Sequence, residues 1–199
     1  VIDYSESVLA MKLEQFEANI PAGIHLAYLP RPGIIRLRLT GRSANGDQLA
    51  ADLDMLSGQL HDLLGSSIIS YEDKPVAAIL GDMLRERGLT ISTAESCTGG
   101  NMAHEITAIA GSSDYFVGSV VSYSNDVKQS VLGVPASVLA AEGAVSQPVV
   151  EQMCRGVNDL LHTQCSIATS GVAGPGGGSP EKPVGTVWIC VQCGDRQVA

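Results

Sequence analysis

The chain has 199 residues, 45% of them hydrophobic, and a formal net charge of −9. This length allows one large domain or two small ones, and the apolar content is sufficient for packed cores. The negative charge argues against nucleic acid as the main partner, because neutralising phosphates requires clustered lysine and arginine. No apolar run reaches the roughly 18 residues that cross a bilayer, so we expect no membrane association.

Residues 1–74 predict a small α+β unit. We expect a helix at residues 4–20, strands at residues 24–29 and 34–39, a second helix at residues 48–64 and a third strand at residues 67–71. Units of this kind sometimes bind RNA, but Arg36 and Arg38 are the only basic grouping, and no G-x-x-G with basic neighbours is present. A structural or dimerising role is favoured, and we expect a homodimer.

Residues 72–75 are charged and contain proline, which predicts a boundary between units 1–74 and 75–199. Beyond it, helices and strands alternate, which predicts a layered α/β/α domain with a mainly parallel sheet. Helices are expected at residues 76–87, 99–110, 125–132, 134–142 and 147–161, and strands at residues 89–93, 115–123, 165–170 and 184–192. The sequence lacks an initial methionine and stops soon after Gly194, so we expect a fragment of a longer protein.

The five cysteines form an odd set without the spacing of a disulfide framework. This favours a reducing compartment, and we expect the protein to be cytoplasmic. Cys190 and Cys193 form a C-x-x-C, but they lie in an apolar, strand-like run, and no second pair completes a zinc site. Ordinary buried thiols are therefore favoured over a redox or metal role.

Three expected strands end in polar segments, at residues 95–100, 123–128 and 169–178. Parallel strands would bring these segments to one edge of the sheet, where α/β folds bind ligands. Ser96 is the candidate nucleophile. Lys128 is the candidate general base, because a lysine desolvated in a crevice has a lowered pKa. Together they would form a Ser–Lys dyad, an alternative to the Ser-His-Asp triad.

Each of these features also has a purely structural interpretation. Ser96 or Thr98 could serve only as a helix N-cap, and Lys128 could be a solvated surface lysine. The loop over residues 174–178 could cradle a phosphate through backbone N–H groups, with Lys182 as countercharge, or it could be a surface loop. It matches neither a Walker P-loop nor a dinucleotide fingerprint. Clusters with metal-ligand spacing are absent from the sequence, so we expect no metal.

Four segments, AESCTGG, YSNDVKQSVLGV, GAVS and ATSGVAGPGGGSPEKPVGTVWI, resemble the successive signature blocks of the CinA C-terminal domain. That family includes stand-alone nicotinamide mononucleotide deamidases. The resemblance covers about residues 75–191, and residues 1–74, with LAYLPRPGIIRLRLTG, resemble the KH-like middle domain of full-length CinA proteins. The resemblance implies a last helix after residues 194–196, so we expect that the C-terminal helix of the family is missing from residues 75–199.

The resemblance implies hydrolysis of the carboxamide of nicotinamide mononucleotide, without a cofactor. Ser96 would attack the amide carbon, Lys128 would accept its proton, and Tyr123 would assist by hydrogen bonding near that pair. Backbone N–H groups around Thr98, Gly99 and Gly100 would hold the oxyanion. The expected substrate-binding residues are Glu95, Thr98, Gly99, Gly100, Asn125, Thr169, Ser170, Gly171, Gly174 and Gly176.

Two other functions remain open from the sequence. In the first, the chain is a non-catalytic nucleotide-binding module of a larger CinA protein, and Ser96 only caps a helix. In the second, the chain is an interaction fragment whose residues 1–74 form a dimer or RNA surface, which the acidic charge disfavours.

Overall fold

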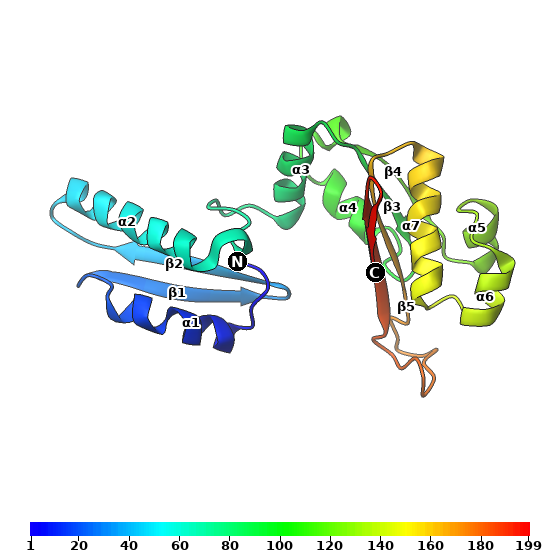
Figure 1. Ribbon diagram of the computed structural model, residues 1–199, viewed down its shortest axis with the longest axis horizontal. Helices are drawn as coiled ribbons and strands as arrows, with labels where there is room; N and C mark the ends of the chain where they lie inside the picture. The colour runs from blue at the N-terminus through cyan, green and yellow to red at the C-terminus, as the bar shows by residue number, and fades with distance from the viewer. The chain divides into compact units, whose positions relative to one another are not determined.

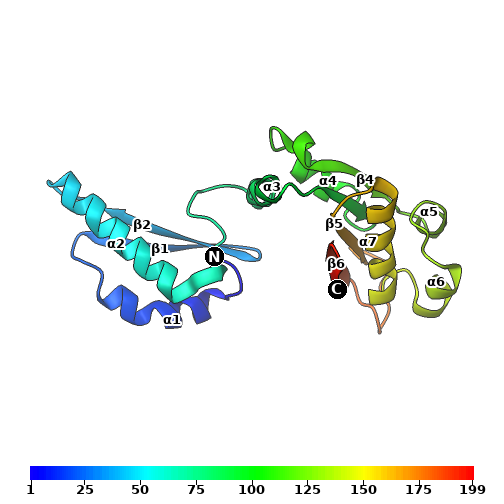
Figure 2. The same cartoon turned by 45° about the horizontal axis from the view of Figure 1, so that its top comes forward.

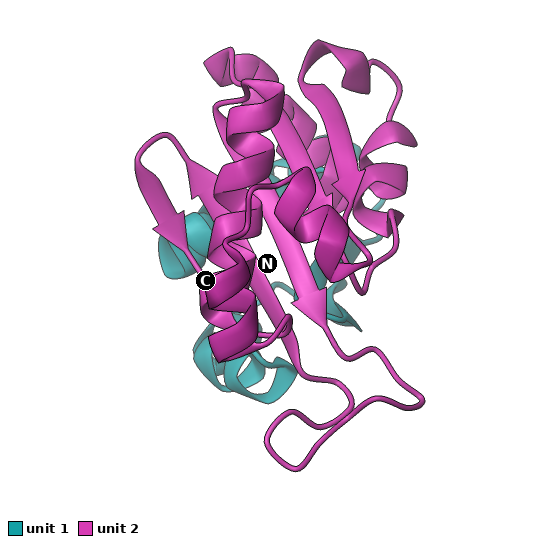
Figure 3. Ribbon diagram, turned by 90° about the vertical axis from the view of Figure 1, so that its right-hand side faces the viewer, with its two compact units in different colours: residues 1–74 teal, residues 75–199 magenta.

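A computed structural model describes residues 1–199, which divide into two compact units, residues 1–74 and 75–199 (Figure 3). Each unit has its own hydrophobic core. No helix in the chain is both long enough and apolar enough to cross a bilayer.

The first unit is a β-hairpin covered by two helices. Its elements are α1 (Glu6–Ala18), β1 (Ile24–Arg31), β2 (Ile34–Gly41) and α2 (Gly46–Leu64). The strands pair antiparallel, with Leu26 opposite Leu39 and Tyr28 opposite Leu37, so their apolar side chains share one face. Leu9 and Leu56, from the two helices, are buried in the same core. The predicted hairpin and both helices are confirmed.

The prediction of a strand over residues 67–71 is wrong. A short 3₁₀ turn, η1 (Gly65–Ser67), follows α2, and no strand succeeds it. A strand needs a free sheet edge, but Val1 and Ile35 exchange both backbone hydrogen bonds on the outer edge of β2. Ser67 contributes only its carbonyl, to the Ile2 N–H. The apolar residue Ile68 instead packs against the core.

The second unit is a five-stranded sheet between two layers of helices. Its helical elements are α3 (Val76–Arg87), α4 (Asn101–Thr107), η2 (Ser112–Asp114), α5 (Asn125–Ser130), α6 (Ala136–Glu142) and α7 (Gln147–Leu161). Its strands are β3 (Ile91–Glu95), β4 (Phe116–Val121), β5 (Cys165–Gly171), β6 (Val187–Cys193) and β7 (Arg196–Val198). The strand order is β4-β3-β5-β6-β7, with β4, β3 and β5 parallel and β6 and β7 antiparallel to their neighbours. The predicted layered α/β class is confirmed, and β7 was not predicted.

The two faces of this sheet bury different cores. One core joins Ala94 and Ala168 of the strands to Val150 and Met153 of α7. The other contains Leu84 of α3 with residues from β3, α4 and β5. Figure 1 accordingly shows α3 and α4 on one side of the strands and α7 on the other, and Figure 2 shows α5 and α6 beyond α7.

The strand order reverses direction at β3. From β3 the chain passes to β4 on one side and later returns to β5 on the other side. Such a reversal leaves a gap between the connections at the carboxyl ends of the strands, which is where open α/β sheets bind ligands. The residues that follow β3 therefore lie at the position best suited to chemistry.

Gly156 of α7 allows the chain after α5 to approach closely. A Cβ at this position would lie 1.9 Å from the carbonyl oxygen of Leu132. We predict that Gly156→Ala lowers the free energy of unfolding by about 2 kcal/mol or more, because a backbone carbonyl cannot move aside cheaply. Thermal unfolding followed by circular dichroism measures this.

Gly58→Ala is the matched control, since Gly58 lies within α2 and a Cβ there would meet nothing within 4 Å. Its expected effect is a gain of about 0.5–1 kcal/mol, the usual benefit of alanine over glycine inside a helix. A similar gain for Gly156→Ala would contradict the close approach.

Candidate functional site

The carboxyl ends of β3, β4 and β5 are linked by backbone hydrogen bonds around the turn that follows β3. The N–H of Ser96 donates to the carbonyl of Thr169 on β5, at 3.0 Å. The N–H of Ser122, just beyond β4, donates to the carbonyl of Glu95, at 2.8 Å. The turn is therefore fixed from both neighbouring strands.

The structure brings Ser96 and Lys128 into contact. Lys128 Nζ donates to Ser96 Oγ at 3.1 Å and to the Ser122 carbonyl at 2.7 Å. Lys128 is only 1% exposed, and Ser96 is also buried. The lysine lies on α5, whose first turn is capped by the Ser124 hydroxyl, which accepts from the Val127 N–H at 3.2 Å.

Burial lowers the pKa of Lys128 below its ordinary value of 10.5. The cause is desolvation, which disfavours the charged ammonium, and the nearby Cys97 thiol opposes it only in part. Both hydrogen-bond partners of Nζ are neutral oxygens. The environment therefore shifts the equilibrium toward the neutral amine, the form that can act as a base.

Glu95 fixes the start of α4. Its carboxylate is fully buried and accepts three backbone N–H bonds, from Gly100 at 3.0 Å, Met102 at 3.0 Å and Ala103 at 2.8 Å. A carboxylate at a helix N-terminus satisfies orphan donors and complements the helix dipole. Because both oxygens are engaged in this way, the expectation that Glu95 binds substrate is corrected to a positioning role.

The backbone donors of the turn differ from those expected. The Gly99 N–H donates to the Ser96 carbonyl at 3.1 Å, and the Gly100 N–H is one of the three bound by Glu95. The N–H groups of Cys97 and Thr98 donate to no backbone or carboxylate oxygen. Burial raises the pKa of the Cys97 thiol, while these two N–H groups and the Lys128 charge act to lower it. The net effect on the Cys97 pKa is upward, because desolvation outweighs the two N–H groups and Lys128, and the Glu95 charge adds to the rise.

Tyr123 and Asn125 do not contact the dyad. Tyr123 is 78% exposed and its hydroxyl forms no hydrogen bond. Asn125 is the exposed first residue of α5, where its carbonyl accepts from Gln129. Both residues follow a strand end, but their side chains are exposed and form no hydrogen bond with Ser96 or Lys128.

The expected hydroxyl residues of β5 lie next to the turn. Thr98 Oγ1 and Thr169 Oγ1 are 2.8 Å apart, so the turn after β3 and the end of β5 share a hydroxyl pair. Ser170 is turned toward the other face, where its hydroxyl donates to the Ala144 carbonyl at 2.7 Å. Thr98 and Thr169 therefore belong to the rim of the site, and Ser170 fixes the loop after α6.

The glycine-rich loop between β5 and β6 extends beyond the sheet (Figures 1 and 3). Added Cβ atoms would lie 2.7 Å from the Thr186 carbonyl at Gly171 and 2.6 Å from Val184 at Gly174. Glycine is therefore required at both positions, because neighbouring atoms of the chain leave no room for a side chain. Gly176 is exposed, and a Cβ there would meet nothing within 4 Å.

Lys182 holds this loop against α6. Its Nζ donates to the Glu142 carbonyl at 2.6 Å, at the end of α6, where a positive charge complements the helix dipole. The lysine expected as a countercharge for phosphate thus has a structural partner.

Sequence reasoning missed the roles of two neighbours of the dyad. Ser122 supplies the carbonyl that orients Lys128 Nζ, and its only sequence signal is its position before the polar segment that follows β4. Cys97 supplies a backbone donor and a thiol near Lys128, and its signal is its place directly after Ser96.

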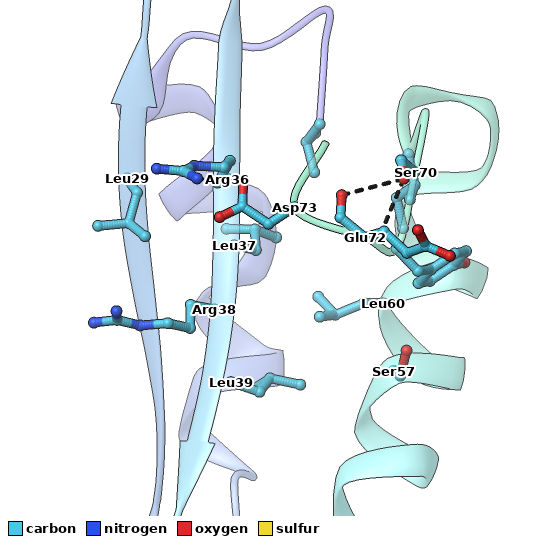
Figure 4. A pocket seen from close by; sticks show the side chains of 13 residues that line it. Leu29, Arg36, Leu37, Arg38, Leu39, Ser57, Leu60, Ser70, Glu72 and Asp73 are labelled. Carbon is cyan, nitrogen blue, oxygen red and sulfur yellow. Dashed lines mark hydrogen bonds and ion pairs between the residues drawn. The ribbon is translucent and has the colours of Figure 1, made fainter. Parts of the chain in front are cut away.

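A separate hollow of about 370 Å³ lies in the first unit, between β2, α2 and the segment after it (Figure 4). Leu37, Leu39 and Leu60 point into it. Its carboxylates are paired, since Asp73 contacts Arg36 and Glu72 contacts Lys74. The Tyr71 hydroxyl at its edge lies 2.6 Å from His61 Nδ1, but this pair is exposed, in contrast to the buried Ser96 and Lys128.

The family model described as the CinA C-terminal domain matches residues 73–199. The chain belongs to the CinA family. A CinA-like protein from Salinibacter ruber is 44% identical over 184 residues, covering 92% of this chain and 44% of that protein. A CinA-like protein from Flavobacterium psychrophilum is 42% identical over 187 residues, covering 94% of this chain and 45% of the relative. The chain thus spans less than half the length of these CinA relatives.

Solved structures of CinA-family proteins share the fold. The competence/damage inducible protein of Agrobacterium tumefaciens is 41% identical, with a TM-score of 0.60 over 61% of this chain and 74% of that one. A CinA superfamily protein from Escherichia coli is 28% identical, with a TM-score of 0.61 over 68% of this chain and 81% of that one.

The buried carboxylate of Glu95 generates a stability prediction. We expect Glu95→Gln to lower the free energy of unfolding by about 1–3 kcal/mol, because an amide turns an N–H₂ group toward backbone donors and leaves some unsatisfied. Chemical denaturation measures the change. Glu105→Gln, on the exposed face of the same helix, is the control and should stay within about 0.5 kcal/mol of wild type. Equal effects of the two substitutions would contradict the positioning role.

Proposed function

We propose that residues 75–199 hydrolyse the carboxamide of nicotinamide mononucleotide to nicotinate mononucleotide and ammonia. The observation that carries this proposal is the 3.1 Å contact between Lys128 Nζ and Ser96 Oγ, both shielded from solvent. The dyad supports the reaction class, acyl transfer to a serine. The choice of a pyridine mononucleotide rests on the resemblance of the segments around this dyad to those of CinA-family deamidases.

In the proposed mechanism, Lys128 acts first as base and then as acid. Its neutral amine accepts the Ser96 proton while Oγ forms a bond to the carboxamide carbon. The ammonium then gives this proton to the leaving nitrogen, the C–N bond breaks and ammonia departs. A water molecule, deprotonated by the same amine, attacks the Ser96 ester and releases the nicotinate product.

We propose the N–H groups of Cys97 and Thr98 as the oxyanion donors. They are the two N–H groups of the turn that no backbone or carboxylate oxygen occupies, and both are directed so that they oppose the rise of the Cys97 pKa that burial causes. Preorganised donors of this kind stabilise the charge that develops on the carbonyl oxygen in the transition state. The rim formed by Thr98 and Thr169, with the exposed loop around Gly176, is our proposal for the ribose-phosphate side.

Ammonia release from nicotinamide mononucleotide tests the proposal. We expect wild-type turnover, a loss on the order of 10⁴-fold or more for Ser96→Ala, and a loss of about 10²–10⁴-fold for Lys128→Met. Ser113→Ala, at an exposed serine of the same unit, is the control and should keep full activity.

Circular dichroism establishes that each variant is folded. Turnover that survives in folded Ser96→Ala would refute the dyad. Mononucleotide binding by wild type and Ser96→Ala alike, without ammonia from either, would instead indicate a non-catalytic nucleotide-binding module.

The lowered pKa of Lys128 predicts the direction of the pH dependence. Because only the neutral amine accepts a proton, kcat/KM should rise with pH and level off once Lys128 is deprotonated. Burial places that midpoint below the ordinary lysine value of 10.5. Lys128→Arg, which stays protonated, should show no such rise. A wild-type profile that is flat, or that falls over the same range, would contradict a lysine base.

A further inference from the structure

The cysteines of β6 do not form one C-x-x-C site, because they point to opposite faces of the strand. Residues three apart on a strand lie on different sides of the sheet. Cys190 is buried beneath α7, where Cys154 Sγ lies 3.5 Å from its carbonyl. Cys193 is exposed and lies directly opposite Cys165 of β5. Four of the five thiols thus fall into two neighbouring pairs.

The register and the hydrogen bonds define how Cys165 and Cys193 face each other. The Cys165 N–H donates at 2.9 Å to the Thr90 carbonyl, on the β3 side, and therefore not to β6. The adjacent bond between β5 and β6 runs from the Gly194 N–H to the Gln164 carbonyl, also at 2.9 Å. Cys165 and Cys193 consequently occupy a non-hydrogen-bonded position of the antiparallel ladder. Such pairs have Cα atoms about 4.5 Å apart and side chains on the same face.

That geometry meets the requirement of a disulfide, whose Cα atoms lie about 4.4–6.8 Å apart. We propose that Cys165 and Cys193 are a redox-active thiol pair, which closes to a cross-strand disulfide when it meets a small-molecule disulfide such as oxidised glutathione. Both thiols are free in this structure, so it represents the reduced form. The proposal stands independently of the proposed amidase activity.

The difference in solvent exposure determines which of the two thiols reacts first. The exposed Cys193 thiolate attacks one glutathione sulfur, and a glutathione thiolate leaves and takes up the proton that Cys193 lost. Cys165 then attacks the Cys193 sulfur, and the second glutathione leaves with the Cys165 proton. Two protein thiols are oxidised and one small disulfide is reduced to two thiols. Burial, and to a lesser extent the neighbouring Cys193, raises the pKa of Cys165, which makes it the less reactive thiol and leaves the first attack to Cys193.

The disulfide would join β5 and β6 at the end of the hairpin remote from Ser96. Cys165 opens β5, whereas Thr169, which holds the Ser96 turn, lies toward its other end. Formation of the disulfide therefore does not block access to Ser96 and Lys128. Its main effect is to restrict the unfolded chain around the loop between the two strands, which stabilises the folded state.

Treatment of the reduced native chain with oxidised glutathione tests this pair. We expect an intramolecular product lighter than the starting protein by two hydrogen atoms. After denaturation, an alkylating reagent should then modify three of the five cysteines. The thermal midpoint should rise by several degrees, and dithiothreitol should reverse both changes.

Two serine variants identify the bond. Cys193→Ser, at an exposed position, should abolish the product, whereas Cys97→Ser, at the other partly accessible thiol, should leave it unchanged. Wild-type protein that gains a stable glutathione adduct on Cys193, with Cys165 still alkylatable, would overturn the proposal. Formation of the same intramolecular product by Cys193→Ser would also overturn it, because the bond would then involve Cys190 or Cys97.

Discussion

Burying the amine of Lys128 beside Ser96 removes a charged group from water, which is costly unless the group is paired or becomes neutral. The hydrogen-bond partners of Nζ are a hydroxyl and the Ser122 carbonyl, neither of them charged, so burial shifts the amine toward its neutral form. A neutral amine that contacts a serine hydroxyl is a base in position to remove that hydroxyl proton. The environment of one side chain thus accounts for the reactivity proposed for the unit.

The surrounding structure keeps that contact in place. The parallel strands β4, β3 and β5 bring their carboxyl ends together, and backbone bonds from Ser96 and Ser122 connect all three. Glu95 adds a third restraint by binding the first N–H groups of α4. Glu95 was expected to bind substrate because it directly precedes the candidate nucleophile, yet its hydrogen bonds are those of a helix cap. The two roles differ only in the direction of the side chain.

The sequence predicted most elements of both units, because helical and alternating apolar patterns are local. It failed at residues 67–71, where the segment contains two adjacent isoleucines but the edge of β2 was occupied, and at residues 196–198, which are a strand only through pairing with β6. Ser96 and Lys128 were predicted because each follows the end of a parallel strand. Tyr123 follows a strand as well, but it points to solvent. Orientation beyond a strand end depends on tertiary packing that no periodicity encodes.

The most direct test of the central claim is an NMR titration of the lysine side chains. The chain has four lysines, Lys12, Lys74, Lys128 and Lys182, so ¹³C labelling at Cε gives a simple spectrum. The account predicts one resonance that titrates clearly below the ordinary value of 10.5 and disappears in Lys128→Met. Four resonances that titrate together near the ordinary value would contradict it, because Lys128 would then be a charged lysine at the pH at which the enzyme is proposed to work.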